Sequence, residues 1–414
     1  MRTATLLQIA LALLIAIASE AQESGTDDPF DFDLTEVAAP TAWQLNGFLE
    51  MRSQRFRDDS EQETEFLSNR AYLDLELKWT GDKWRAFVSG FSGYDPAAEN
   101  FRHPERSEIR EVYVQRDGGG WSLTAGKVRL AWGIADGVST IDLINAIVLR
   151  DPIGNARTPS RRPTWLLRAE KTTAIGAFEA VWMPRGRDRK LPEFGNPWEP
   201  QLLNDLRVGA AAGFFDLDLQ DPHEDEYGFR YRHFGQGFDW GAAVFDGTTD
   251  APVVLEESAG RVTLRPGEIR TWNLNGAFGL ARSTLRGEAS FTTDAPLGEA
   301  AADRTQLVVG WDRTFFTSFY VNVQLFHDRY AGLFEDNGVT FAITEMFFGD
   351  AVTAGVRGQA SRFDQYAGEV FVDYQWTDAF RIGVKSSWFG GEPGSGLGDF
   401  RDNDYAELSV RWSF

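Results

Sequence analysis

The last ten residues, Tyr405 to Phe414, read YAELSVRWSF and alternate between apolar and polar side chains. One face of an extended chain would carry Ala406, Leu408, Val410, Trp412 and Phe414. The opposite face would carry Tyr405, Glu407, Ser409, Arg411 and Ser413. A two-residue period of this kind predicts a β-strand. In a barrel that crosses a bilayer, the apolar face meets lipid and the polar face lines a wet lumen. The pattern therefore predicts a transmembrane strand.

The aromatic residue at the very end of this strand is a second signal. A C-terminal strand of this type resembles the signal by which bacterial outer-membrane barrels are recognised for assembly. The residues that carry the resemblance are Tyr405, Leu408, Val410, Trp412 and Phe414. The resemblance implies the barrel-assembly machinery as a partner, and outer-membrane lipid and lipopolysaccharide as the surroundings.

A longer alternating run extends from Leu67 to Thr80. Its apolar side contains Leu67, Ala71, Leu73, Leu75, Leu77 and Trp79, interrupted only by Asn69. Strands of soluble sandwiches usually have about five or six residues, whereas a tilted membrane strand needs about 9 to 11. The length of the run favours a membrane strand.

Loop lengths predict the strand number, because outer-membrane barrels have short periplasmic turns and longer outer loops. Counted back from Phe414, short connections fall at Thr377 to Ala379, Gly349-Asp350, Thr314 to Thr317, Ala281-Arg282, Phe234 to Gly237, Thr173 to Gly176, Asp117 to Gly120 and Thr80 to Lys83. Longer segments lie between them. The pattern predicts an all-β fold, a transmembrane antiparallel up-and-down β-barrel of 18 strands with both ends in the periplasm.

Two segments leave this count open. A 16-strand barrel is the alternative, because Val339 to Phe348 and Ala351 to Ala360 alternate least regularly. Arg207 to Phe215 is also strand-like, but the alternation of short and long connections places it inside the outer loop Pro184 to Glu224.

The N-terminus has the pattern of an export signal. Arg2 precedes an apolar run from Ala4 to Ala18, and Ser19-Glu20-Ala21 offers small residues to a signal peptidase. A spanning helix would need about 20 apolar residues, so a membrane anchor fits this short run less well. We predict a signal peptide at residues 1–21, an acidic periplasmic leader at 22–41, and an outer-membrane barrel at 42–414.

Composition excludes several classes of site. With 41 Lys plus Arg against 62 Asp plus Glu, the formal charge is −21, which disfavours nucleic-acid binding. The chain has no Cys, which removes disulfides, covalent haem and thiolate metal sites. None of the four His falls in a catalytic pattern or in a metal-binding spacing. We expect no enzyme activity, no cofactor and no metal.

The segment from Ala131 to Pro163 follows an upward strand and is long enough to fold back into the lumen. Its candidate constriction residues, together with one on the next strand, are Trp132, Gly133, Asp136, Asp142, Asn145, Arg150, Asp151, Arg157, Arg161, Arg162 and Arg168. Trp132 and Gly133 would turn the chain over the barrel lip, and the Asp and Asn side chains would pin the loop. The arginines would favour anions at a constriction. The alternative is that Asp and Arg pair with each other and only brace the loop.

This segment also carries a family resemblance. Trp132-Gly133 with Asp136, then Asp142 with Asn145, then Arg150-Asp151-Pro152, looks like porin-type barrels of the alginate-export kind and their uncharacterised relatives. The resemblance implies a single-chain barrel that passes solutes across the outer membrane, and for some relatives an inner-membrane exporter as partner. It does not imply a particular substrate.

Three functions follow from these patterns. The leading hypothesis is a passive channel for small hydrophilic or amphiphilic solutes. The second is an outer-membrane component of an export or lipid-trafficking system, and the third is a barrel enzyme such as a lipid hydrolase. A further basic run of Arg185, Arg187, Arg189 and Lys190 is expected either to face lipopolysaccharide phosphates or to be solvated.

Overall fold

The computed structural model of the chain describes residues 42–57, 65–97, 107–147, 161–187, 189, 191–221, 224–362 and 364–414. The predicted signal peptide and leader lie outside these residues. Within the described ranges, 18 strands form one sheet and three short strands form another. No helix in these ranges is long and apolar enough to cross a membrane.

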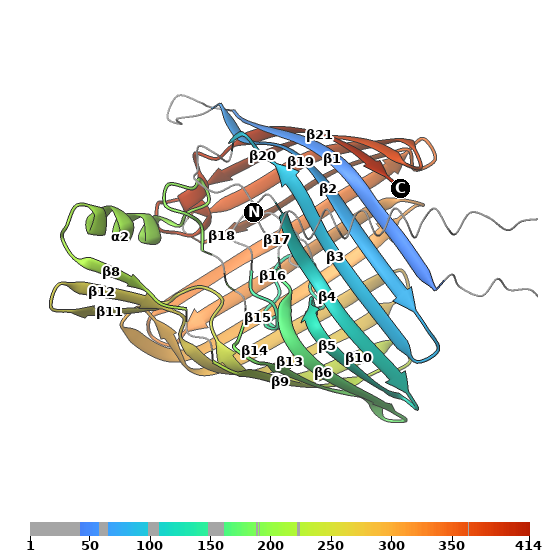
Figure 1. The fold of residues 1–414 in the computed structure, drawn as a ribbon, viewed down its shortest axis with the longest axis horizontal. Helices are drawn as coiled ribbons and strands as arrows, with labels where there is room; N and C mark the ends of the chain where they lie inside the picture. Colours follow the sequence, from blue (N-terminus) through green and yellow to red (C-terminus); the bar gives the residue numbers. More distant parts are fainter. Residues whose placement is uncertain are drawn as a thin grey trace, which may run out of the picture. The chain divides into compact units, whose positions relative to one another are not determined.

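The large sheet follows the chain order (Figure 1). Its strands are β1 (Trp43–Phe56), β2 (Phe66–Thr80), β3 (Trp84–Tyr94), β4 (Ser107–Gly118), β5 (Trp121–Val128), β6 (Thr164–Thr173), β7 (Gly176–Met183), β9 (Glu226–His233), β10 (Phe238–Thr248), β13 (Glu268–Leu280), β14 (Ser283–Leu297), β15 (Ala300–Phe315), β16 (Phe319–Tyr330), β17 (Phe334–Phe347), β18 (Val352–Ser361), β19 (Tyr366–Thr377), β20 (Phe380–Gly390) and β21 (Tyr405–Ser413). The small sheet contains β8 (Asp216–Leu219), β11 (Val254–Ser258) and β12 (Arg261–Arg265). In the described part of the chain, the helical elements are α2 (Gln201–Ala211) and the 3₁₀ turn η2 (Leu397–Phe400).

The final strand closes the barrel. Each strand of the large sheet pairs antiparallel with the next, and β21 pairs with both β20 and β1. At the end of the seam, the Gly47 N–H donates to the Phe414 carbonyl at 3.0 Å and the Phe414 N–H donates back at 2.9 Å. Closure leaves no open edge, which a sheet in lipid requires because hydrocarbon cannot hydrogen-bond an unpaired backbone.

The two faces of β21 have the predicted environments. Leu408, Trp412 and Phe414 are each about half exposed on the outside, at 53%, 50% and 48%. On the inside, Tyr405 and Glu407 are buried. Apolar side chains standing outward around a closed barrel would be unfavourable in water, and they form the surface that a bilayer solvates.

The predicted connections are confirmed at all eight short turns, and the count of 18 strands is confirmed with them. The 16-strand alternative is wrong, because Val339 to Phe348 and Ala351 to Ala360 lie almost wholly in β17 and β18, which pair with each other. Arg207 to Phe215 is not a strand. Helix α2 covers its first half, since a short apolar run fits either structure until a pairing partner is present.

One residue of the predicted lipid face points the other way. Leu67 is only 6% exposed and packs in an apolar cluster with Phe56 and Tyr405. The register between β1 and β2 shifts beside it, since Gln54 pairs with Ser68 whereas Arg55 pairs with Phe66. The shift leaves Leu67 as the extra residue of a bulge and turns it toward the barrel interior.

Candidate functional site

We call the connection between β5 and β6 the lumen loop. The structure describes its residues 129–147 and 161–163, and these lie inside the barrel. The Trp132 side chain is 1% exposed and packs in an apolar cluster on the inner wall with Leu166, Val181 and Phe245. We call this attachment the root of the loop. The Trp132 indole N–H donates to Glu179 Oε1 at 2.8 Å. The ring is thus fixed by packing and by a hydrogen bond to a buried carboxylate.

Beyond Trp132, the loop donates hydrogen bonds to a carboxylate on the barrel wall. Glu288 of β14 is 3% exposed and accepts four hydrogen bonds from the loop. Its Oε1 accepts from the N–H groups of Ile134 (2.6 Å) and Ala135 (2.8 Å), and its Oε2 accepts from Ser139 Oγ and the Thr140 N–H, both at 2.8 Å. Bonds to a charged acceptor are stronger than neutral ones, so Glu288 is the main polar anchor of the loop.

Glycine lets the loop wrap this closely around the carboxylate. A Cβ at Gly133 would lie 2.2 Å from Ser139 Oγ. A Cβ at Gly137 would lie 2.3 Å from Oγ1 of Thr340 on β17. Both positions are too tight for any side chain without movement of the loop.

Two further contacts extend the anchor to neighbouring strands. Asp136 Oδ2 accepts from the Arg286 guanidinium and from Asn322 Nδ2, both at 3.0 Å. The Gly137 N–H donates to Gln324 Oε1 at 2.8 Å. Asp136 is therefore a structural acceptor bound to β14 and β16.

These partners show that the loop crosses the lumen. Counted along hydrogen-bonded neighbours from β5, β14 is the sixth strand and β17 the ninth, which is half-way round an 18-stranded barrel. Glu288, Gln324 and Thr340 are all buried on the inner face. A segment rooted at β5 and bound to β14, β16 and β17 divides the interior of the barrel.

Asn145 and Asp142 fix the returning part of the loop. Asn145 Oδ1 accepts from the Leu130 N–H at 2.6 Å, and Nδ2 donates to the Arg162 carbonyl at 2.8 Å. Asp142 Oδ1 accepts from the Trp132 N–H at 3.0 Å. Burial raises the pKa of the Asp142 carboxyl, and this outweighs the opposite effect of Arg161 and the Trp132 N–H.

The described arginines of the predicted set are all paired with carboxylates. Arg161 donates to Asp250 at 3.2 Å, Arg162 to Glu108 at 3.0 Å, and Arg168 to Glu170 and Glu179 at 2.7 and 3.1 Å. These contacts are the ones expected if the arginines brace the loop. Arg150, Asp151 and Arg157 lie outside the described residues.

The prediction for the second basic run is wrong at two positions. Arg187 is 1% exposed and its Nε donates to Glu226 at 3.0 Å, while the guanidinium also pairs with Asp250. Arg189 donates to the same Glu226 at 2.9 Å. The carboxylates come from β9 and from the connection after β10, and sequence spacing could not reveal them.

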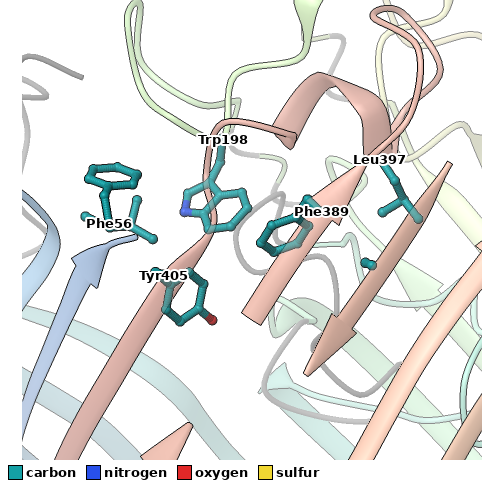
Figure 2. Packing of buried hydrophobic residues seen from close by; sticks show 7 residues of the cluster. Phe56, Trp198, Phe389, Leu397 and Tyr405 are labelled. Atoms are coloured by element: carbon teal, nitrogen blue, oxygen red, sulfur yellow. The ribbon is translucent and has the colours of Figure 1, made fainter. Parts of the chain in front are cut away.

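The same outer loop reaches a distant part of the wall. Trp198 packs among Phe56, Phe389 and Tyr405 (Figure 2). Its ring centroid lies 5.5 Å from that of Phe389 and 5.3 Å from that of Phe400, with the rings near perpendicular. A residue that follows β7 thus docks on β1, β20 and β21.

An arginine pair that the sequence analysis missed faces the lumen. Arg52 and Arg70 are directly opposite each other on β1 and β2, on the inner face. Arg52 is paired with Glu50 at 2.6 Å. Among the described residues, no carboxylate lies within ion-pair distance of Arg70, and its guanidinium lies over the Tyr72 ring at 4.8 Å from the centroid. The inward alternation of β1 and β2 could have indicated both residues, but not their pairing.

The described part of the chain holds no group of His, Asp or Glu side chains arranged to bind a metal ion. Its buried carboxylates instead meet arginines, lysines or backbone N–H groups.

Solved structures with a similar fold are known. No family model matches the chain, and no curated protein matches it. Among solved structures it is similar to OccAB3 of Acinetobacter baumannii, with a TM-score of 0.55 at 8% identity over 90% of this chain and 98% of that one. It is equally similar to OccK5 (OpdH) of Pseudomonas aeruginosa, with a TM-score of 0.55 at 8% identity over 90% and 96%. The fold is therefore that of a porin-type outer-membrane barrel. The resemblance to alginate-export barrels is not tested by these matches and stays a prediction.

Proposed function

We propose that this protein is an outer-membrane channel for passive diffusion of small hydrophilic solutes. The observation that carries the proposal is the lumen loop, which crosses the barrel and is held on the far wall by Glu288 and Asp136. A loop fixed in this way narrows a wide barrel without filling it with an apolar core. Pore width and the charges that line it then set which solutes pass.

The orientation follows from the connections. The eight short turns lie in the periplasm and the long connections face outward, as in other bacterial barrels. Outer-membrane lipid and lipopolysaccharide surround the apolar band, and removal of a signal peptide precedes insertion.

A preference for small anions is supported by Arg70. Arg161 and Arg162 of the lumen loop are paired with carboxylates, whereas Arg70 faces a second arginine across the strand pair. Arg52 is itself paired with Glu50, so Arg70 is the charge on this strand pair that can act on a diffusing anion. This wall therefore favours anionic solutes over cationic ones.

Conductance of the purified full chain in a planar lipid bilayer tests the proposal. We expect discrete current steps in salt solution, with a reversal potential in a salt gradient that indicates anion preference. Absence of current from a correctly folded barrel, judged by heat-modifiable migration and β-sheet circular dichroism, would refute the channel function.

A further inference from the structure

The outer loop between β7 and β9 crosses the mouth of the barrel. Arg187 fixes its beginning on the β9 side through Glu226. Residues 191–200, which we call the strap, then lead to Trp198 on β20, β21 and β1. The chain returns through α2 to β8, whose Asp216–Leu219 pairs parallel with β12 of the connection after β10. Its start and its return therefore lie near one wall, and its turning point lies on another.

The seat of Trp198 faces the interior of the barrel. Phe56 pairs with Tyr405 on the seam between β1 and β21, and Tyr405 is on the polar, inward face of β21. Below Phe56 and Tyr405 the same wall is charged, with Gln54 donating to Glu407 at 2.7 Å. A segment that reaches inward-facing side chains from the opposite side must pass over the opening.

The strap is also shaped for this position. Pro192, Pro197 and Pro200 restrict its backbone. Glu199 holds it in one conformation, because its carboxylate accepts from the Gly195 N–H at 2.8 Å and from Arg207 of α2 at 2.5 Å. At the seat, Asn403 Nδ2 donates to the Pro197 carbonyl at 2.6 Å. The strap is thus a stiff segment with one apolar anchor and one polar anchor.

We propose that the strap is a size filter at the outer entrance, seated by Trp198 and acting in series with the lumen loop. The inward-facing aromatic patch formed by Phe56, Phe389 and Tyr405 would be exposed to water at the mouth if the strap left it. The hydrophobic effect therefore keeps the strap seated, and the seated strap divides the entrance. Trp198 is a positioning residue, because it acts through the strap. This inference rests on the proposed channel function.

Liposome swelling with a series of uncharged sugars of increasing size tests the filter, because neutral solutes are insensitive to lumen charge. The full chain with Trp198→Ala is compared with the unchanged chain and with Phe214→Ala. Phe214 belongs to the same outer loop but is 79% exposed and is not part of the cluster. We expect Trp198→Ala to admit larger sugars and Phe214→Ala to leave the exclusion limit unchanged.

Asn403→Ala provides a second variant that removes the polar anchor and leaves the aromatic seat intact. It should shift the exclusion limit in the same direction by a smaller amount. The filter can therefore still be tested if Trp198→Ala fails to fold. An unchanged limit in each folded variant, with normal uptake of small sugars, would overturn the filter and leave the channel standing. No uptake of any sugar by any folded form would overturn the channel function itself.

Discussion

The lumen loop and the strap both reach across the barrel, but the main anchor of each has the opposite chemistry to that of the other. The far side of the lumen loop is bound to Glu288, a buried carboxylate that accepts four hydrogen bonds. The strap is held through Trp198, whose ring packs among other aromatic rings. Directional hydrogen bonds fix the position of a segment within the wet interior, whereas apolar packing is non-directional and needs only a patch shielded from water.

The difference follows from where each segment lands. The inner face of a transmembrane barrel is polar, so the lumen loop meets carboxylates, amides and hydroxyls there. The rim above it carries the aromatic patch, and there the strap can use a tryptophan. In the channel that we propose, the loop would therefore set a fixed constriction and the strap would be the more easily displaced element.

The two segments nevertheless share one root. Asp250, in the connection after β10, pairs with Arg161 of the lumen loop and with Arg187 at the start of the outer loop that contains the strap. Arg187 also donates to the Leu143 carbonyl of the lumen loop at 2.8 Å. The near ends of the two segments are therefore linked through Arg187 and Asp250.

The largest effect is expected from Glu288→Gln, which breaks the polar anchor. The amide keeps one acceptor oxygen, but its NH₂ group replaces the other oxygen and faces the N–H and hydroxyl donors that were bound there. About two charge-assisted bonds of roughly 1.5–3 kcal/mol each are therefore lost. The lumen loop should leave the β14 wall and single-channel conductance should rise. Glu369→Gln removes the same charge from the lumen wall, where Glu369, among the described residues, contacts Arg357, Lys385 and Ser387 and no residue of the lumen loop. An equal rise in this control would contradict the anchor.

Arg187→Met should disturb both segments at their common root. Removing one partner of a buried ion pair costs about 3–5 kcal/mol, because Glu226 and Asp250 keep their charges without this cation. Limited proteolysis should then cut the outer loop faster, and channel currents should become noisier. Arg185→Met is the matched control, since Arg185 is exposed and its backbone N–H, which the substitution keeps, donates to Asp225. If both variants behave alike, the segments do not share this root.

Trp132→Phe removes a single hydrogen bond and keeps most of the packing. The lost bond from the indole N–H to Glu179 is worth about 1.5–3 kcal/mol, because its acceptor is charged. Mean conductance should stay near that of the unchanged chain, with larger fluctuations as the root of the lumen loop loosens. Bilayer recordings at fixed voltage measure both. A conductance rise as large as that of Glu288→Gln would show that the root, not the far anchor, holds the loop.

The smallest effect, on selectivity alone, is expected from Arg70→Gln. The reversal potential in a potassium chloride gradient should shift toward less anion preference. Arg85→Gln removes the same charge from the inner face of β3, but Arg85 is already paired with Asp117 at 2.7 Å and should give a smaller shift. Equal shifts would mean that ion pairing does not determine which arginine acts on passing ions.

Much of the barrel could be predicted from the chain alone. The alternation in Tyr405 to Phe414 requires one face in lipid and one in a polar interior, and the short turns fix the strand number. Both signals are local, since neighbouring strands are joined by short turns. The inward position of Leu67 could not be predicted, because a bulge depends on the partner strand. Helix α2 could not be predicted, because a short apolar run fits a helix or a strand until a pairing partner is known.

The candidate site was accessible only in part. The sequence indicated that residues 131–163 form a long loop with Trp132, Asp136 and Asn145 as structural features. Which carboxylate each arginine meets, and that Glu288 and Trp198 anchor segments from across the barrel, follow from closure of the sheet. Closure brings together residues more than a hundred positions apart, and no periodicity along the chain encodes such a contact. The sequence by itself determined the wall, and only the tertiary structure determined what crosses the space inside it.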